Sequence, residues 1–376
     1  MAHAYTPGLR VTELAALRKE RILPLKGEVV VTEGDLVRAE QVVARTELPG
    51  NVHSLNVANL LSVLPDEVPS KMVKGPGESV ERDEIIAKSA TLFGLFKSNV
   101  KSPITGSIES VSEVTGQVLL REPPIPVEVD AYVDGLVVEV RPEEGVIVET
   151  HGSLIQGIFG IGGETFGVVE MAVDRPDQDL DAASITAEHE GKILVGGSLV
   201  TSAALEKAVS CGVRGVVAGG IDDATIKEFL GYDIGVAITG TEEKGVTVVV
   251  TEGFGRIPMA DATFKLLQSR VGMKASINGA TQIRAGVIRP EVVVPLEGKK
   301  AEGGPAASVV AGGLAPGTRV RIIREPHFGE LGDVQELPAP LSKLASEAMV
   351  RVLTVKLQEN GELHTLPRAN VEIIES

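Results

Sequence analysis

Hydrophobic and polar positions alternate with a period of two from residue 25 to about residue 170. Stretches such as KGEVVVTEGDLV, GSIESV and GVIVET alternate or are β-branched, and Gly, Pro and Asp interrupt them. This alternation puts side chains on opposite faces of a pleated strand, so it predicts an all-β region of many short strands. Before it, Thr12–Arg21 carries Leu14 and Leu17 on one helical face, which predicts a short helix capped by Thr12.

An internal duplication organises this β region, and such repeats indicate the architecture. Two segments share a glycine turn followed by apolar and charged positions. They align at one constant offset, which matches Gly34, Val37, Val43, Ala44 and Arg45 with Gly77, Val80, Ile86, Ala87 and Lys88. Two further segments place an alternating strand between glycines, and they align Gly106 and Gly116 with Gly135 and Gly145. Each half of one small β-structure therefore has a copy nearby.

After residue 185 the pattern changes to alternating strands and helices. Continuous apolar strands are expected at Lys192–Gly197, Val213–Gly220, Asp233–Gly240 and Gly245–Gly253. Amphipathic helices are expected at Ser202–Gly212, Asp222–Gly231 and Pro258–Arg270. Apolar strands separated by helices indicate a parallel sheet covered on both faces.

The remaining segments complete a multidomain map that combines all-β and α/β parts. Asp174–Ser184 is acidic and contains proline, which predicts a linker, and Leu296–Leu314 is rich in Gly and Ala, which predicts a flexible connector. The predicted parts are an N-terminal helix or arm (1–24), a β region (25–172), a linker (173–184), a three-layer α/β domain (185–295), a connector (296–315) and a C-terminal β domain (316–376).

The β region resembles the barrel-sandwich-hybrid fold. The resemblance lies in the pairing of a GDxV half with a PxxG half, and it covers about residues 25–170. Biotinyl and lipoyl carrier domains, efflux adaptors and the C subunit of Rnf electron-transport complexes share this fold. Carrier domains attach their cofactor to a lysine shortly before a Pro-Gly corner, and Lys97 lies near that place. It lacks the flanking Met or Asp of carrier motifs, so biotin or lipoyl attachment is not expected and Lys97 is interpreted as a surface lysine.

The C-terminal segment Pro316–Leu337 resembles a KOW motif, part of NusG-type SH3-like barrels. The matching residues are Gly317, Val320, Ile322, Phe328, Gly329, Gly332 and Val334, and the strands that follow would complete a five-stranded barrel. The resemblance implies contacts with RNA, ribosomal proteins or RNA polymerase, and its candidate contact residues are Arg319, Arg321, Arg324 and Phe328. Single-stranded RNA needs a platform of stacking aromatics, and Phe328 stands alone, so a protein contact or a structural role is preferred.

Charge and cysteine content narrow the classes of function. The 376 residues carry 52 Asp and Glu against 36 Lys and Arg, a net charge of −16 that would repel phosphates. Nucleic acid is therefore expected only through the KOW-like barrel. The lone Cys211 cannot form an internal disulfide, and no apolar run reaches the length of a membrane span, so a cytoplasmic protein is expected. The histidines lack metal-ligand spacing, so no metal or cofactor is expected.

The α/β domain offers one candidate ligand site. Ligands of open α/β sheets bind beyond the carboxyl ends of the strands, where glycines let backbone amides approach an anion. The candidates there are Gly196, Gly197, Ser198, Gly219, Gly220, Asp222, Thr239, Glu252, Gly253 and Arg256. Arg256 would clamp a phosphate or carboxylate, and Asp222 or Glu252 would bind a ribose hydroxyl. Glycines at strand ends also serve short turns, and no phosphate-binding or dinucleotide fingerprint is present.

Three functional hypotheses follow. We prefer a non-catalytic scaffold or adaptor whose β modules contact other proteins and which self-associates as a homo-oligomer. This interpretation depends on the duplicated modules, the absence of a catalytic constellation, and an acidic chain with few aromatics. One alternative is a ligand-binding or enzymatic α/β domain that recognises a phosphorylated or carboxylate small molecule. The other is a transcription- or translation-associated factor that acts through the KOW-like barrel.

Overall fold

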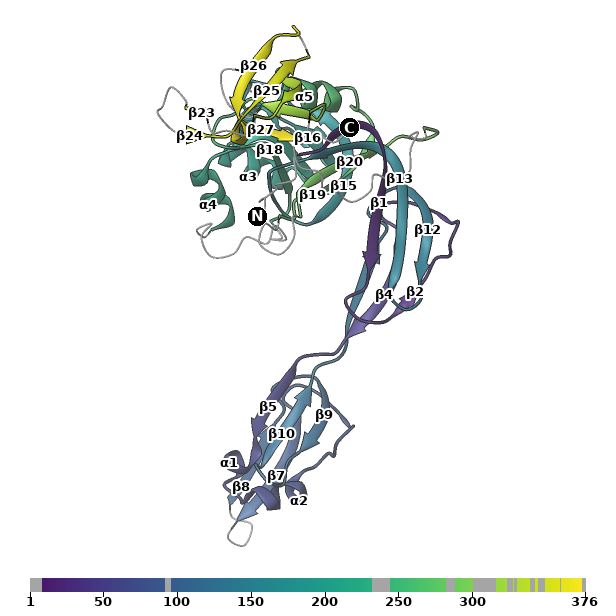
Figure 1. The fold of residues 1–376 in the computed structure, drawn as a ribbon. Helices are drawn as coiled ribbons and strands as arrows, with labels where there is room; N and C mark the ends of the chain where they lie inside the picture. The colour runs from purple at the N-terminus through teal and green to yellow at the C-terminus, as the bar shows by residue number, and fades with distance from the viewer. Residues whose placement is uncertain are drawn as a thin grey trace.

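The computed structural model describes residues 9–91, 96–231, 244–281, 288–299, 316–322, 327, 330–338, 342–343, 349–358 and 360–373. Three bodies follow one another along an elongated molecule (Figure 1). We call them the distal module (residues 51–122), the middle module (residues 11–48 and 125 to about 150) and the head, which follows in the sequence and carries the C-terminal sheet. In the described part of the chain, no helix has the length and apolar character that a membrane span requires.

The first strand corrects the prediction of an N-terminal helix. The segment is β1 (Val11–Ile22), which pairs antiparallel with the long strand β13 (Gly145–Gln156) over almost its whole length. Ala15 and Leu17 are buried by this pairing. The Ala, Leu, Glu and Arg residues of β1 favour a helix, but such local preferences are small, and strand pairing with burial outweighs them.

The middle module combines β1 and the first half of β13 with shorter strands and has its own core. Those strands are β2 (Glu28–Val29), β3 (Leu36–Val37), β4 (Val42–Leu48), β11 (Ile125–Asp130) and β12 (Gly135–Arg141). Its buried centre includes Val37, Val43, Val137 and Val148. The chain leaves this module after β4 and returns at β11, where Leu48 pairs with Ile125.

The distal module is inserted between β4 and β11, and two chain segments join it to the middle module (Figure 1). One sheet has the order β5-β10-β9-β6, and β7 and β8 form a separate hairpin. A separate hydrophobic core includes Ile86, Ile108 and Leu120. The elements are β5 (Val52–Asn56), α1 (Val57–Leu61), η1 (Pro65–Glu67), α2 (Val68–Lys71), β6 (Ser79–Val80), β7 (Ile85–Thr91), β8 (Phe96–Lys101), β9 (Gly106–Val111) and β10 (Gln117–Arg121).

The predicted duplication is present in the strand pairing of the two modules. Val37 of β3 pairs with Gly135 of β12 in the middle module, and Val80 of β6 pairs with Gly106 of β9 in the distal module. These are the aligned positions of the two repeats. Each module therefore holds one copy of each half, and one module is inserted into the other.

The glycine turns of the first repeat also make equivalent hydrogen bonds. The amide of Gly34 donates to the carbonyl of Val137 (2.8 Å), and the amide of Gly77 donates to the carbonyl of Ile108 (2.7 Å). Both glycines have a positive φ, 93° and 87°, which a residue with a side chain rarely adopts. The shared backbone geometry explains why glycine recurs at this position.

One aligned pair is not equivalent in space. Gly116 lies in the turn before β10 with φ 67°, whereas Gly145 is the first residue of β13 and pairs with Arg141. The register of the second half is therefore displaced by one residue after the turn. Sequence alignment of two glycines cannot detect such a displacement, because either position tolerates glycine.

The head is built on the continuation of β13, which pairs with β20 (Glu291–Pro295). The sheet adds β14 (Phe159–Ile161), β15 (Glu164–Met171), β16 (Lys192–Val195), β17 (Gly215–Ile221), β18 (Thr247–Phe254) and β19 (Lys274–Asn278). β16, β17 and β18 run parallel, as predicted, and β15 extends this parallel set, whereas β14, β19 and β20 pair antiparallel. Its helices are α3 (Ser202–Ser210), α4 (Asp223–Leu230) and α5 (Asp261–Gln268). The strand expected at Asp233–Gly240 lies outside the described residues.

Two predicted boundaries of the α/β part differ from the structure. The sequence pattern predicts β14 and β15 as part of the β region, but they pair with β18 and β16 in the head sheet. The segment predicted as a linker, 173–184, packs against the head, and its Leu180 is fully buried. Its Asp and Pro residues serve turns, since Asp181 accepts hydrogen bonds from the first residues of η2 (Ala182–Ser184). A second short turn, η3 (Ala187–His189), follows.

The C-terminal residues form a five-stranded antiparallel sheet in the order β26-β25-β22-β21-β27, with its own core of valines, leucines and an isoleucine. These strands are β21 (Arg319–Ile322), β22 (Leu331–Glu336), β25 (Val352–Leu357), β26 (Leu363–Pro367) and β27 (Val371–Ile373). The smaller elements are β23 (Ser342–Lys343), β24 (Met349–Val350) and η4 (Arg368–Asn370). Most of the expected connector 296–315 lies outside the described residues.

Candidate functional site

The glycines at the carboxyl ends of β16 and β17 are packed against the chain's own backbone. A Cβ atom on Gly197 would lie 2.3 Å from the carbonyl oxygen of Gln178. A Cβ atom on Gly220 would lie 2.0 Å from the carbonyl oxygen of Gly255. Cβ atoms in real structures do not approach a backbone oxygen so closely, so any other residue at these positions would force the backbone to shift. The space that we predicted for an anion is occupied by two loops of the same chain.

The backbone amides at these strand ends already have acceptors. Each donates to a carbonyl oxygen of the head, and the bonds are Gly196 to Val217 (2.8 Å), Ser198 to Gln178 (2.8 Å), Gly219 to Gly197 (2.8 Å) and Gly220 to Ser198 (2.5 Å). An amide engaged with a carbonyl cannot also bind an anion in the same direction. These four amides therefore do not form an anion cradle.

The polar side chains at this edge form a small network around Asp179. The hydroxyl of Ser198 donates to Asp179 Oδ1 (2.6 Å), and Arg256 Nη2 lies 2.5 Å from Asp179 Oδ2. The Arg256 side chain remains 65% exposed. We missed Asp179 in the sequence because it lies in the segment interpreted as a linker. The edge thus brings Ser198 and Arg256 together through an acidic residue.

The other candidates at this edge have separate roles. Asp222 caps α4, because its carboxylate accepts a hydrogen bond from the amide of Thr225 (2.6 Å). Gly253 has a φ of 154° at the end of β18, and Thr239 lies outside the described residues. Asp222 therefore has a structural role as the N-cap of α4.

Glu252 and Arg321, predicted for two different sites, are ion-paired with each other. Glu252 Oε2 lies 3.2 Å from Arg321 Nη1, and the two side chains are only 1% and 6% exposed. Glu252 Oε1 also accepts a hydrogen bond from the amide of Ala260, just before α5 (3.0 Å). The pair joins β18 to β21, so it fixes the C-terminal sheet on the head.

The remaining residues of the KOW-like segment do not form an open basic face in the described part of the chain. Arg319 lies 3.5 Å from Asp333 and lines a cleft of about 420 Å³ between β1, α5 and the C-terminal sheet. Arg324 and Phe328 lie outside the described residues. Of the two predicted contact residues that the structure describes, Arg319 is partly exposed and Arg321 is buried.

Two further sequence candidates have simple positions. The backbone of Lys97 lies in β8 opposite Ala90 of β7. Cys211 is half-buried at the end of α3. Among the residues that the structure describes, no group of three or more His, Cys, Asp or Glu side chains is arranged to hold a metal ion.

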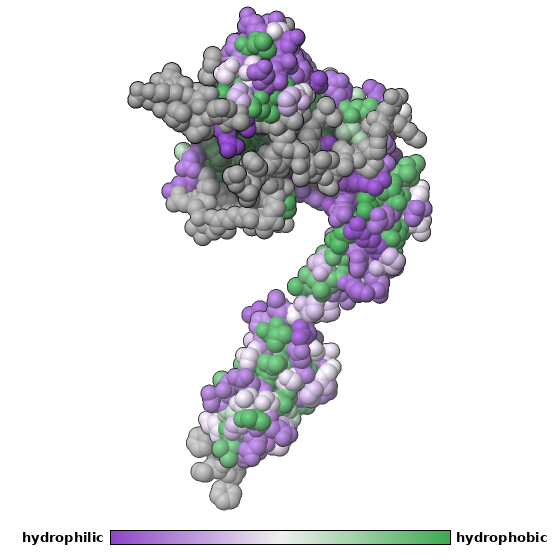
Figure 2. All heavy atoms as spheres, in the orientation of Figure 1, coloured by the Kyte–Doolittle hydropathy of each residue, from purple (hydrophilic) through white to green (hydrophobic). Residues whose placement is uncertain are grey.

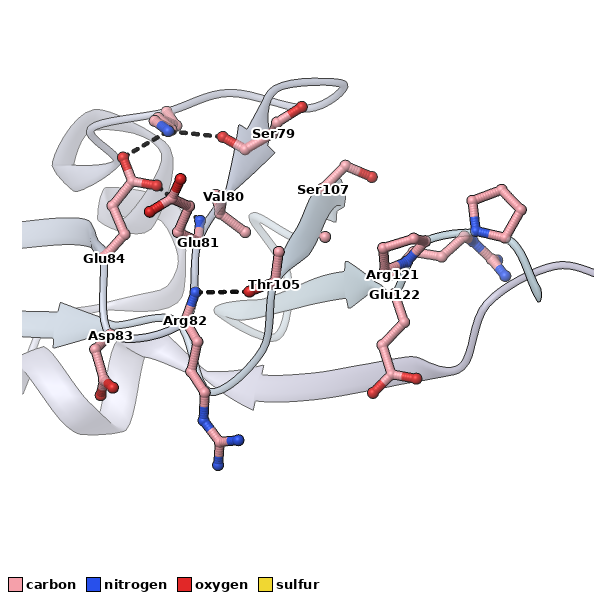
Figure 3. Close-up of a pocket in the computed structure, with 14 residues that line it drawn as sticks. Ser79, Val80, Glu81, Arg82, Asp83, Glu84, Thr105, Ser107, Arg121 and Glu122 are labelled. Carbon is pink, nitrogen blue, oxygen red and sulfur yellow. Dashed lines mark hydrogen bonds and ion pairs between the residues drawn. The ribbon is translucent and has the colours of Figure 1, made fainter. Parts of the chain in front are cut away.

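A groove lined mostly by polar and charged residues lies on the distal module, and we missed it in the sequence (Figure 3). We call it the distal groove; its volume is about 1160 Å³. Its walls come from the turn between β6 and β7, the start of β9 and the end of β10. The lining residues are Lys74, Ser79–Glu84, Thr105–Ser107 and Arg121–Pro124.

Some charges of the distal groove are neutralised within the module, and others are not. Lys74 Nζ lies 2.6 Å from Glu84 and donates to the carbonyl of Ser79 (2.6 Å). The hydrogen bond from Lys74 lowers the pKa of Glu84 below its ordinary value. Arg82 and Asp83 are exposed, and their side chains extend away from this pair (Figure 3). The groove therefore presents Arg82 and two carboxylates, Glu81 and Asp83, to solvent.

The surface of the distal module is mixed, with apolar atoms among hydrophilic ones (Figure 2). Several large apolar side chains are exposed there: Leu60, Leu64, Val73 and Val114. Exposed apolar side chains that are scattered singly occur on most protein surfaces, so these four do not by themselves mark a contact site. Comparison of the chain with protein-family models, with curated proteins and with solved structures gives no match.

Proposed function

We propose that this chain is a non-catalytic scaffold or adaptor whose distal module contacts a partner protein, while the head and middle module form a continuous base. The observation that carries the proposal is the separation of the distal module. It has its own hydrophobic core, and two short segments hold it away from the head. A duplicated module that contributes nothing to the core of the base is available for an external contact.

The strand ends of the head also support this proposal, because their polar groups are already paired within the chain. The amides at the carboxyl ends of β16 and β17 donate to the chain's own carbonyls, and Glu252 is buried against Arg321. A small ligand at this edge would have to displace those contacts. The ligand-binding alternative therefore has less support than the adaptor.

The two resemblances remain part of the proposal. The paired halves of each β module favour the barrel-sandwich-hybrid type, and the five-stranded sheet with its own core favours the KOW-like type. Burial of Arg321 removes one residue from the basic face that an RNA contact would use. We therefore favour protein contacts over nucleic acid for the whole chain.

Affinity capture with two versions of this chain tests the proposal. One is the full chain, and the other replaces residues 51–122 with a short hairpin turn. Because Leu48 pairs with Ile125, the two ends are already adjacent and the turn closes them without strain. Partners recovered from native lysate only by the full chain, with or without nuclease, support the adaptor. Equal recovery by both chains would contradict it, and nuclease-resistant ribosomal or polymerase subunits on both would favour the KOW-centred alternative.

A further inference from the structure

The middle module shows how this type of β module docks on another part of a protein. Lys274 of β19, in the head, lies between two carboxylates of the middle module. Its Nζ is 2.5 Å from Glu40 and 2.9 Å from Asp134. Ser276, two residues along the same strand, donates a short hydrogen bond to the carbonyl of Tyr132. An extended segment thus presents a lysine to the turn that follows β3.

The duplication places equivalent positions beside the distal groove. At the offsets of the two repeats, Asp83 corresponds to Glu40 and Thr105 corresponds to Asp134. Strand pairing supports this correspondence, because Val80 pairs with Gly106 just as Val37 pairs with Gly135. The acidic position that meets Lys274 in the middle module is therefore repeated at the groove.

The hydrogen bonds of the two turns agree with this correspondence. In the middle module the amide of Ala39 donates to Asp134 Oδ1 (2.7 Å). In the distal module the amide of Arg82, the residue aligned with Ala39, donates to Thr105 Oγ1 (3.1 Å). The same backbone donor therefore meets the same side-chain position in both modules. The turns differ at the next residue, because Asp83 has a positive φ of 68° and Glu40 does not.

The turn of the middle module and the distal groove differ in whether another segment of the chain contacts them. In the middle module Lys274 of β19 pairs with Glu40 and Asp134, and Ala39 is almost fully buried. At the distal groove Arg82 and Asp83 are exposed, and within the described residues no ion pair to Asp83 is found. One module therefore has its docking face filled from within the chain, and the other has the same face open.

We propose that the distal groove is the docking face for a partner protein that presents a lysine from an extended segment, as Lys274 of β19 does to the middle module. This inference rests on the proposed adaptor function. Asp83 accepts the partner's ammonium group. Thr105 supplies a hydroxyl where the middle module has a second carboxylate. The partner's lysine is therefore bound by one carboxylate and one hydroxyl instead of by two carboxylates. Arg82, in place of Ala39, donates to a carbonyl or carboxylate of the partner.

A titration of the isotope-labelled full chain tests the inference. The probe is the acetylated and amidated peptide VGMKASING, which is residues 271–279 of the chain itself. We expect saturable NMR shifts in residues 79–84 and 105–107. Replacing the peptide's lysine with norleucine, or making Asp83→Asn, should weaken binding about tenfold, as the loss of one charge-assisted hydrogen bond does.

The matched control is Glu113→Gln, which removes an exposed carboxylate after the far end of β9 and should leave binding unchanged. Absence of saturable shifts, shifts centred on Glu40 and Asp134, or an affinity that Asp83→Asn does not change would each overturn the inference. Failure of the adaptor proposal is distinguishable. If a partner still depends on the distal module but not on Asp83, the adaptor function stands and the lysine-docking mode is wrong.

Discussion

Glu252 and Arg321 form a buried ion pair, with Glu252 Oε2 3.2 Å from Arg321 Nη1. The two residues belong to the last parallel strand of the head and the first strand of the C-terminal sheet. Charges removed from water need each other, because an unpaired buried charge is far more costly than a neutral group. The pair therefore holds the C-terminal sheet in one position on the head.

Removing one partner of this pair should destabilise that junction. We expect Arg321→Ala to lower the free energy of unfolding by about 3–5 kcal/mol, because Glu252 remains buried without its cation. Urea unfolding followed by circular dichroism measures the change, and hydrogen exchange in β18 and β21 localises it. Arg319→Ala is the control. Its ion pair with Asp333 is largely exposed, so the expected change is below about 1 kcal/mol. Equal stability of the two variants would show that the pair does not fix the sheet.

A second prediction separates packing glycines from ligand-binding glycines. Gly220→Ala should destabilise the head by about 1–3 kcal/mol, because the new methyl group would meet the carbonyl oxygen of Gly255. Gly163→Ala is the control, since a Cβ atom there has nothing within 4 Å. Thermal unfolding of both variants gives the comparison. A Gly220→Ala protein as stable as the parent would mean that the strand end is not closely packed.

The contact between the middle module and the head should depend on pH through Glu40. The hydrogen bond from Lys274 lowers the pKa of Glu40 below its ordinary value of 4.5. A carboxyl whose folded-state pKa is lowered stabilises the folded state above its unfolded pKa, and that contribution is lost as the pH falls through the folded pKa. We expect stability to fall on acidification below about pH 4.5, and to fall less in Glu40→Gln.

Stability curves against pH for the parent and two variants check this prediction. Glu33→Gln, at an exposed position in the same module, is the matched control and should follow the parent curve. A Glu40→Gln protein with the same acid dependence as the parent would contradict the assignment. Asp130 acts with the opposite sign, because burial raises its pKa, so the Glu40 contribution has to be read as a difference between variants.

Burial of the segment predicted as a linker gives a further test. Leu180→Ala should lower the free energy of unfolding by about 2–5 kcal/mol, because Leu180 is fully buried opposite Val200 and its truncation leaves a cavity. Val114→Ala, at an 87% exposed position, should have almost no effect. Thermal unfolding measures both. A Leu180→Ala change as small as the control would restore the interpretation of a linker.

Local pattern predicted much of the fold. Glycine turns and period-two alternation predicted the β modules and their duplication, and α3, α4 and α5 lie where amphipathic periodicity placed them. The first strand was missed because its residues favour a helix and its pairing partner, β13, is more than a hundred residues away. Local preference is overridden when a distant strand supplies hydrogen bonds and burial.

The contacts of the candidate site residues were harder to predict, because they join residues that lie far apart in the sequence. The sequence predicts Glu252 for a ligand site and Arg321 for an RNA or protein contact, and only the fold shows that the two residues pair with each other. Gly197 and Gly220 suggested an anion site, since sequence does not reveal which loop fills the space beside a glycine. The distal groove was implicit in the duplication, but its open state depends on where β19 lies.

The most direct test of the adaptor function is the affinity of a captured partner for two versions of the chain. The partner would be purified and titrated by calorimetry into the full chain and into the chain with residues 51–122 replaced by a hairpin turn. The account predicts binding to the full chain and no measurable binding to the shortened one, whose head and middle module should keep their spectra. Equal affinity for both chains would contradict the claim that the distal module makes the contact.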